Sequence, residues 1–130
     1  MAESYLSGMH TEEGRRAVAE VLLALFRRWE IAEGDQAKLL GMQEVEPLWQ
    51  GTALPNETAV LERAGLLLAI ERAIQQQFAE QPKMADRWVT LPNIWLQGRS
   101  PLDKMLEGDE GIRQIHDLLP HPDKNPTTAE

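Results

Sequence analysis

Apolar residues recur along most of this chain at the three- and four-residue spacing that is typical of amphipathic helices. The clearest stretch is residues 11–29, where the predicted buried face consists of Val18, Val21, Leu22, Leu25, Phe26 and Trp29. Thr11 stands at its start as an N-cap, since a hydroxyl there accepts a hydrogen bond from an unpaired N–H of the first turn. The pattern predicts a first helix that packs one face against a core.

Two short helices are predicted next, over residues 35–40 and about 44–50. Gly41 ends the first of them, because glycine readily adopts the left-handed conformation that closes a helix. Pro47 fits the second only within its first turn, where a backbone N–H is not needed. The two helices and the turn between them have the lengths of a helix-turn-helix motif.

The longest helix is predicted over about residues 57–78. It is apolar nearly all round between residues 66 and 70, which is typical of a helix covered on several sides. We expect it to join the N-terminal helices to the C-terminal part. The longest apolar run, residues 65–70, is far too short to cross a bilayer.

Residues 85–106 contain two predicted short helices separated by a proline-containing break. Trp88 belongs to the first, which ends before Pro92. Ser100 and Pro101 start the second, because serine is a good N-cap and proline costs nothing at the first helical position. Two conformationally restricted prolines, Pro92 and Pro101, so close together favour an ordered unit over a flexible segment.

No strand pattern is present, so the predicted fold is all-α. A helix-turn-helix-like bundle is joined by a long central helix to a small helical unit. The predicted parts are residues 1–56 for the bundle, 57–80 for the linking helix, 81–119 for the C-terminal unit and 120–130 for a flexible tail. Asp109 is expected to cap the last helix.

Composition places the chain among soluble globular proteins, with 42% hydrophobic and 26% charged residues. The absence of cysteine excludes disulfides and thiolate chemistry, and it fits a reducing compartment. The N-terminus lacks the basic-then-apolar order of a signal peptide. We therefore expect a cytoplasmic protein that does not contact a membrane.

None of the three histidines has the surroundings of a catalytic or metal site. His10 lies near the N-terminus, His121 lies in the tail, and His116 is on the last helix. His116 is adjacent to Asp117, but neighbouring helix positions point about 100° apart, so we interpret this histidine as a solvated residue. No phosphate-binding glycine loop and no metal-ligand spacing is visible. We expect no enzyme activity, no metal and no cofactor.

The formal net charge of -8 disfavours nucleic acid as the main partner. No segment is basic, whereas DNA-binding proteins neutralise phosphates with clustered lysine and arginine. If the helix-turn-helix-like part does bind DNA, the candidate contacts are Gln43, Gln50, Arg27 and Arg28. A basic or otherwise non-acidic protein partner fits the charge better.

The segment around the two C-terminal tryptophans carries residues that often anchor protein interfaces, since tryptophan and arginine are enriched there. Trp95 follows the proline-containing break and lies near Arg99, which favours an exposed position. In the alternative interpretation both tryptophans pack in the core. The two interpretations are compatible if Trp88 lies inside while Trp95 or Arg99 lies outside.

Several stretches resemble the MbcA/ParS/Xre antitoxins of RES–Xre toxin–antitoxin systems. Those similar to the Xre-like helix-turn-helix part are residues 26–31 (FRRWEI), 35–41 (DQAKLLG) and 48–49 (LW). Residues 61–70 resemble the linking helix. Residues 86–93 (DRWVTLPN) and 98–102 (GRSPL) resemble the C-terminal toxin-binding domain, where a W-x-x-x-P-N pattern precedes G-x-S/T-P-L. The resemblance covers about residues 20–119.

This resemblance implies a type II antitoxin. Its N-terminal part would form a homodimer and bind the operator of its own operon. Its C-terminal part would cover the active site of a RES-domain toxin, an enzyme that consumes NAD. The implied toxin contacts are Trp95, Gly98, Arg99, Ser100, Pro101, Leu102, Arg113, His116 and Asp117. Operator DNA is the weaker of the implied partners, because the predicted recognition helix is acidic.

Two other functions remain open at the level of sequence. One is a DNA-binding transcriptional regulator without a toxin partner, and the other is a non-catalytic helical adaptor. Binding to upstream DNA with a steep dependence on salt would favour the regulator.

Overall fold

The structure is a computed structural model that describes residues 9–120 of the chain. Its helices are α2 (Glu12–Arg28), α3 (Glu33–Leu40), α4 (Glu46–Trp49), α5 (Thr58–Gln77), α6 (Pro82–Arg87), α7 (Pro101–Met105) and α8 (Asp109–Leu118), with 3₁₀ turns η1 (Trp88–Thr90) and η2 (Ile94–Leu96). No strand occurs among residues 9–120, which confirms the predicted all-α fold. Within the same residues no helix is both long and apolar enough to span a membrane. His121 and the rest of the predicted tail after Pro120 lie outside the described residues.

The chain divides into two compact units, Met1–Leu68 and Ala69–Glu130. Helix α5 contributes its first part to one unit and its last part to the other. The division falls inside the predicted linking segment, residues 57–80.

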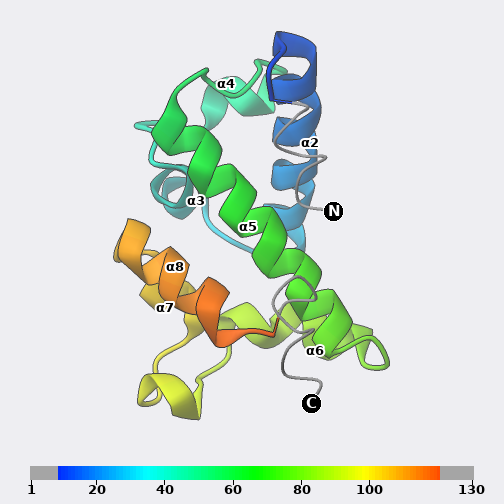
Figure 1. Cartoon of the computed structure of the whole chain (residues 1–130), viewed down its shortest axis with the longest axis vertical. Coiled ribbons are helices and arrows are strands. Elements are labelled where there is room, and N and C mark those ends of the chain that lie inside the picture. Colours follow the sequence, from blue (N-terminus) through cyan, green and yellow to red (C-terminus); the bar gives the residue numbers. More distant parts are fainter. Residues whose placement is uncertain (1–8, 121–130) are drawn as a thin grey trace. The chain divides into compact units, whose positions relative to one another are not determined.

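The first unit gathers α2, α3, α4 and the beginning of α5 around one core (Figure 1). Thr11 caps α2 as predicted, because its Oγ1 accepts a hydrogen bond from the Gly14 N–H at 2.9 Å. Gly41 ends α3 as predicted, with φ 74 in the left-handed region. The side chains that fill this core and are essentially inaccessible to solvent include Leu22, Leu25, Phe26, Leu39, Leu40, Leu54 and Leu67.

The prediction that Val21 lies on the buried face of α2 is wrong, since 47% of this residue is exposed. The buried arc of the helix extends instead towards Ala19 and Leu23, which are 2% and 7% exposed. This shift leaves Val21 on the opposite edge of the arc, at the surface.

Gln36 is a buried polar residue of the first unit, and its side chain holds α3 to α4. Its Nε2 donates to the Ile31 carbonyl at 2.8 Å, and its Oε1 accepts from the Trp49 indole N–H at 3.2 Å. Both polar ends of the amide are therefore satisfied, as burial requires.

Replacing Gln36 with alanine is expected to destabilise the protein by about 1–3 kcal/mol, because the carbonyl of Ile31 and the indole N–H of Trp49 lose their partner. Denaturant unfolding measures this loss. The matched control is Gln43→Ala at an exposed position, for which a change within about 0.5 kcal/mol is expected. Equal effects of the two substitutions would contradict the assigned role of Gln36.

In the second unit α7 and α8 lie side by side (Figure 1). Ser100 caps α7 as predicted, accepting from the Asp103 N–H at 3.0 Å, and Pro101 occupies the first turn. The prediction that Asp109 caps the last helix is wrong: Gly108 takes the cap position with φ 135, and α8 begins at Asp109. Glycine is suited to a φ in this region, which residues with a side chain rarely adopt.

Candidate partner-binding surface

A closed loop, residues 93–99, forms the centre of the candidate surface in the second unit. Asn93 closes it, since its N–H donates to the Arg99 carbonyl and its own carbonyl accepts from Gly98, both at 3.0 Å. The Asn93 Oδ1 also accepts from the Trp95 N–H at 2.8 Å and so caps η2. Gln97 and Gly98 complete the turn in the left-handed region, with φ 60 and 88. These bonds fix the backbone that carries η2.

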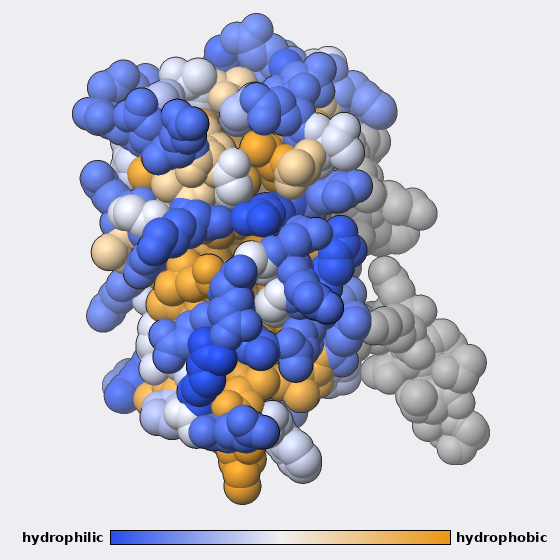
Figure 2. Space-filling model, turned by 90° about the vertical axis from the view of Figure 1, so that its left-hand side faces the viewer, coloured by the Kyte–Doolittle hydropathy of each residue, from blue (hydrophilic) through white to orange (hydrophobic). Residues whose placement is uncertain are grey.

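The loop presents two large apolar side chains to water. Ile94 is 85% exposed and Trp95 is 77% exposed, while Leu96, at 9%, anchors the loop from below. Figure 2 shows apolar atoms projecting at the lower edge of the view, the level at which η2 lies in Figure 1. Adjacent exposed apolar residues on a fixed backbone are typical of a surface that binds another molecule.

A groove of about 740 Å³ lies beside these two side chains. No charged residue lines it; its walls are formed by Gln77, Phe78, Trp88, Pro92, Asn93, Ile94, Trp95, Leu118, Leu119 and Pro120. Trp88, which was expected to lie inside, is only partly buried, because it forms part of a groove wall. The groove and the exposed pair together make an uncharged surface, and eight of the ten residues that line the groove are apolar.

A smaller hollow of about 130 Å³ lies next to Trp95 and is polar. Its lining residues are Trp95, Leu96, Gln97, Arg99, Lys104 and Gln114. Trp95 therefore borders both the apolar groove and the polar hollow.

Arg99 and Lys104 share one carboxylate. Arg99 Nη1 forms an ion pair with Glu107 Oε2, and Lys104 Nζ lies 3.4 Å from Glu107 Oε1. The hydrogen bond from Arg99, together with Lys104, lowers the pKa of Glu107, so this carboxylate remains ionised at neutral pH. Nearly half of each side chain of the Arg99–Glu107 pair is exposed, so the pair contributes little to stability.

The other residues of the predicted GRSPL contact segment have mainly structural positions. Pro101 is buried and Ser100 caps α7, while Leu102 is half-buried. Gly98 lies exposed in the turn of the closed loop. Of this segment, Arg99 is the residue that lines the hollow beside Trp95.

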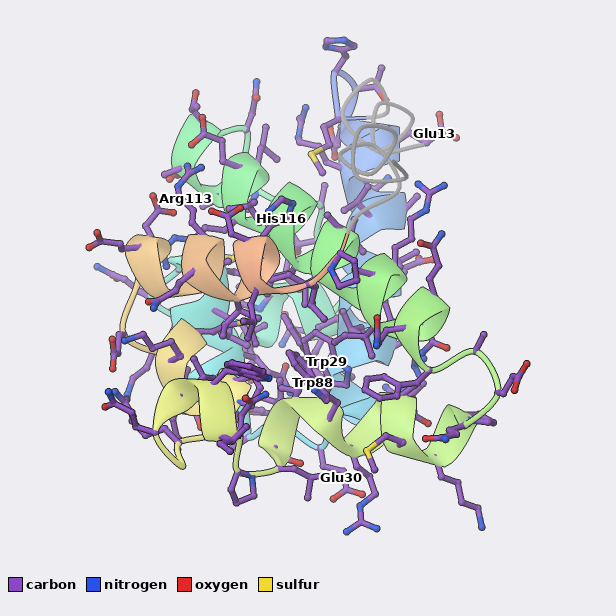
Figure 3. The ribbon with its side chains drawn as sticks, turned by 60° about the horizontal axis from the view of Figure 1, so that its bottom comes forward. Glu13, Trp29, Glu30, Trp88, Arg113 and His116 are labelled. Carbon is purple, nitrogen blue, oxygen red and sulfur yellow. The ribbon has the colours of Figure 1, made fainter. Side chains whose placement is uncertain are left out.

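The three predicted contacts on α8 are not among the residues that line the groove or the hollow. Arg113 Nε is 3.3 Å from Asp109 Oδ2, and His116 Nδ1 is 3.1 Å from Asp117 Oδ1. The side chains of His116 and Asp117 therefore meet, although neighbouring helix positions point about 100° apart, and their contact is exposed to solvent. Figure 3 shows Arg113 and His116 along the same edge of α8. Within residues 9–120 no cluster of three potential metal ligands occurs.

The helix-turn-helix-like part places the predicted DNA contacts around a very short helix. Helix α4 spans only Glu46–Trp49, a single turn, and the exposed Gln43 and Gln50 flank it. The Arg27 guanidinium lies 5.1 Å from the centre of the Trp49 ring, a cation–π contact, and Arg28 is exposed in the last turn of α2.

Three further arginines of the first unit donate to backbone carbonyls. Arg15 donates to Leu54, Arg16 to Gly51 and Arg63 to Lys38, at 3.0–3.1 Å. These guanidinium groups stabilise the connections between helices. The N–H donors used in these hydrogen bonds are not available to bind phosphate.

Comparison with known proteins agrees with a partner-binding C-terminal unit. The family model described as the antitoxin Xre/MbcA/ParS C-terminal toxin-binding domain matches residues 75–120. Over 115 residues the chain is 34% identical to the uncharacterized protein y4oB of Sinorhizobium fredii. The alignment covers 83% of this chain and 86% of that relative.

The chain belongs to the Xre/MbcA/ParS antitoxin family. It is a type II antitoxin whose C-terminal toxin-binding domain implies a toxin partner. Every residue that lines the groove or the hollow lies within the matched residues 75–120.

Proposed function

We propose that this antitoxin neutralises a RES-domain toxin, an enzyme that consumes NAD, by binding over the toxin's active site. The observation that carries the proposal is Trp95, which is 77% exposed beside an uncharged groove in the toxin-binding domain. An exposed indole on a fixed loop is a strong interface anchor, because it buries a large area at little cost in conformational entropy. Neutralisation takes place in the cytoplasm and needs no catalytic group of this chain.

The proposed contact surface has an apolar centre and a charged border. Ile94 and Trp95 form the centre, as the hot spots of interfaces usually do. Arg99 borders it on the hollow side, and Arg113, His116 and Asp117 supply further polar contacts from α8. Gly98, Ser100, Pro101 and Leu102 position Arg99 and the start of α7.

The negative net charge of the chain also supports a RES-domain toxin as its partner. A toxin that binds an anionic dinucleotide requires a positively charged cleft, and the net charge of this antitoxin is -8. Opposite charges raise the rate of association more than they raise the final affinity.

Autoregulation through operator DNA is a separate role, for which Gln43, Gln50, Arg27 and Arg28 remain the proposed contacts. The short α4 and the engaged arginines of the first unit favour weak DNA binding at most. A mobility-shift series with upstream DNA over rising salt tests this role, since phosphate contacts produce a steep loss of affinity. Molecular mass in solution tests the proposed homodimer, which neutralisation does not require.

Co-expression with a RES-domain toxin encoded beside this chain tests the main proposal. We expect a stable complex on co-purification, restored growth, and restored cellular NAD. Failure to form the complex, together with persistent NAD loss, would exclude neutralisation by direct binding. Complex formation without recovery of NAD would exclude coverage of the active site.

A further inference from the structure

Five of the six residues that line the hollow beside Trp95 carry a side-chain N–H group that can donate a hydrogen bond. Only Leu96 lacks such a donor; the others are Trp95, Gln97, Arg99, Lys104 and Gln114. Two of these five are cations, and no carboxylate is among the lining residues. A lining of donors with two positive charges is complementary to an anionic acceptor.

We propose that this hollow receives a single carboxylate side chain, an aspartate or glutamate, from the toxin to which the domain binds. This inference rests on the proposed function, because it takes the toxin as the partner that supplies the carboxylate. Sites for small molecules usually measure about 300–1,000 Å³. The volume of about 130 Å³ is smaller than this, so the hollow suits one side chain and excludes a whole dinucleotide.

Glu107 shows that the two cations hold a carboxylate in the geometry they already have. One of its oxygens pairs with Arg99 Nη1, and the other lies 3.4 Å from Lys104 Nζ. The guanidinium has five N–H donors, so Arg99 retains donors for a second carboxylate. Arg99 and Lys104 carry two positive charges, and Glu107 carries one negative charge. A second carboxylate from the partner would make the net charge of this group zero.

Trp95 joins the hollow to the apolar groove, because it lines both. A partner segment that fills both sites must place an apolar side chain close to an acidic one. The closed loop at Asn93 fixes the distance between the two sites before binding. The structure therefore defines a recognition element on the toxin: an apolar residue followed or preceded closely by aspartate or glutamate.

The first test uses the full chain and no toxin. The dipeptide acetyl-Leu-Glu-amide is titrated at millimolar concentrations while the Trp95 indole and Arg99 Nε–H signals are followed by NMR. We expect saturable shifts with this peptide and much smaller shifts with acetyl-Leu-Gln-amide or acetyl-Leu-Lys-amide. No shift with the acidic peptide, or equal shifts with all three, would overturn the proposal.

The second test uses the complex with the RES-domain toxin. Arg99→Met and Lys104→Met keep the apolar stems and remove the charges, and each is expected to weaken binding about tenfold, as loss of a close charge pair does. Arg72→Met and Lys83→Met are the matched controls, because both residues are exposed and lie outside the hollow. Melting temperatures equal to wild type confirm that the variants fold.

The two tests separate the inference from the proposed function. Absence of a wild-type complex contradicts the choice of a RES-domain toxin, while the peptide titration still decides whether the hollow binds carboxylates. A complex that forms normally and is unaffected by Arg99→Met and Lys104→Met shows that the carboxylate assignment is wrong although neutralisation holds.

Discussion

Replacing Trp95 with alanine is expected to weaken toxin binding by about 30-fold or more, a loss of about 2 kcal/mol that is typical of an interface hot spot. The melting temperature should stay unchanged, because Trp95 is already 77% exposed and removal of its side chain leaves the core intact. Titration calorimetry measures the affinity, and thermal unfolding measures the stability.

Two further variants complete this experiment. Trp95→Phe keeps an aromatic ring and is expected to recover part of the affinity. Val21→Ala removes an exposed apolar group from α2, outside the proposed surface, and should leave toxin binding at the wild-type value. An affinity that is unaffected by Trp95→Ala would show that the loop of residues 93–99 does not anchor the toxin.

Replacing Gly111 with alanine is expected to destabilise the protein by about 3 kcal/mol, the upper end of the range for overpacking. A Cβ at this position would lie 2.0 Å from the Lys104 carbonyl oxygen, a backbone atom, so α7 and α8 must separate to admit it. The gain in helix propensity on changing glycine to alanine, about 1 kcal/mol, is too small to offset that separation. Denaturant unfolding measures the net effect.

Gly34→Ala is the matched control for this substitution. Gly34 also lies within a helix, but nothing is within 4 Å of the position that its Cβ would occupy. This variant is expected to be more stable than wild type by about 0.4–1 kcal/mol, because alanine restricts the unfolded chain. If Gly111→Ala lowers the free energy of unfolding and Gly34→Ala raises it, the close approach of α7 to α8 is supported. If both substitutions raise it, that close approach is refuted.

The elements that the sequence predicts well are those fixed by local chemistry. Thr11, Gly41 and the Ser100–Pro101 pair set helix ends through their own side chains or backbone preferences, and the structure confirms each. Val21 and Gly111 depend on which neighbour packs against the helix, which periodicity does not show. An isolated glycine inside a helical pattern is itself a signal of close packing, and Gly111 carries that signal.

The candidate surface is predictable only in part for the same reason. Trp95 and Arg99 are found from residue type and from their place after a proline, and the exposed position of both agrees with the structure. Lys104 and Gln114 are missed, because they meet Trp95 only after η2, α7 and α8 have folded together. Ile94 is missed as well, although it directly precedes Trp95 in the chain. The apolar Ile-Trp-Leu sequence directly after Asn93 is the signal that could have identified the exposed turn.

The most direct measurement of the central claim is the indole N–H spectrum of the antitoxin with and without its RES-domain toxin. The chain has four tryptophans, and single Trp→Phe variants assign their signals. We predict that the signals of Trp95 and Trp88, which line the groove, change on complex formation, while those of Trp29 and Trp49 in the first unit do not. An unchanged Trp95 signal in a formed complex, with changes at Trp49 instead, would contradict docking through the C-terminal surface.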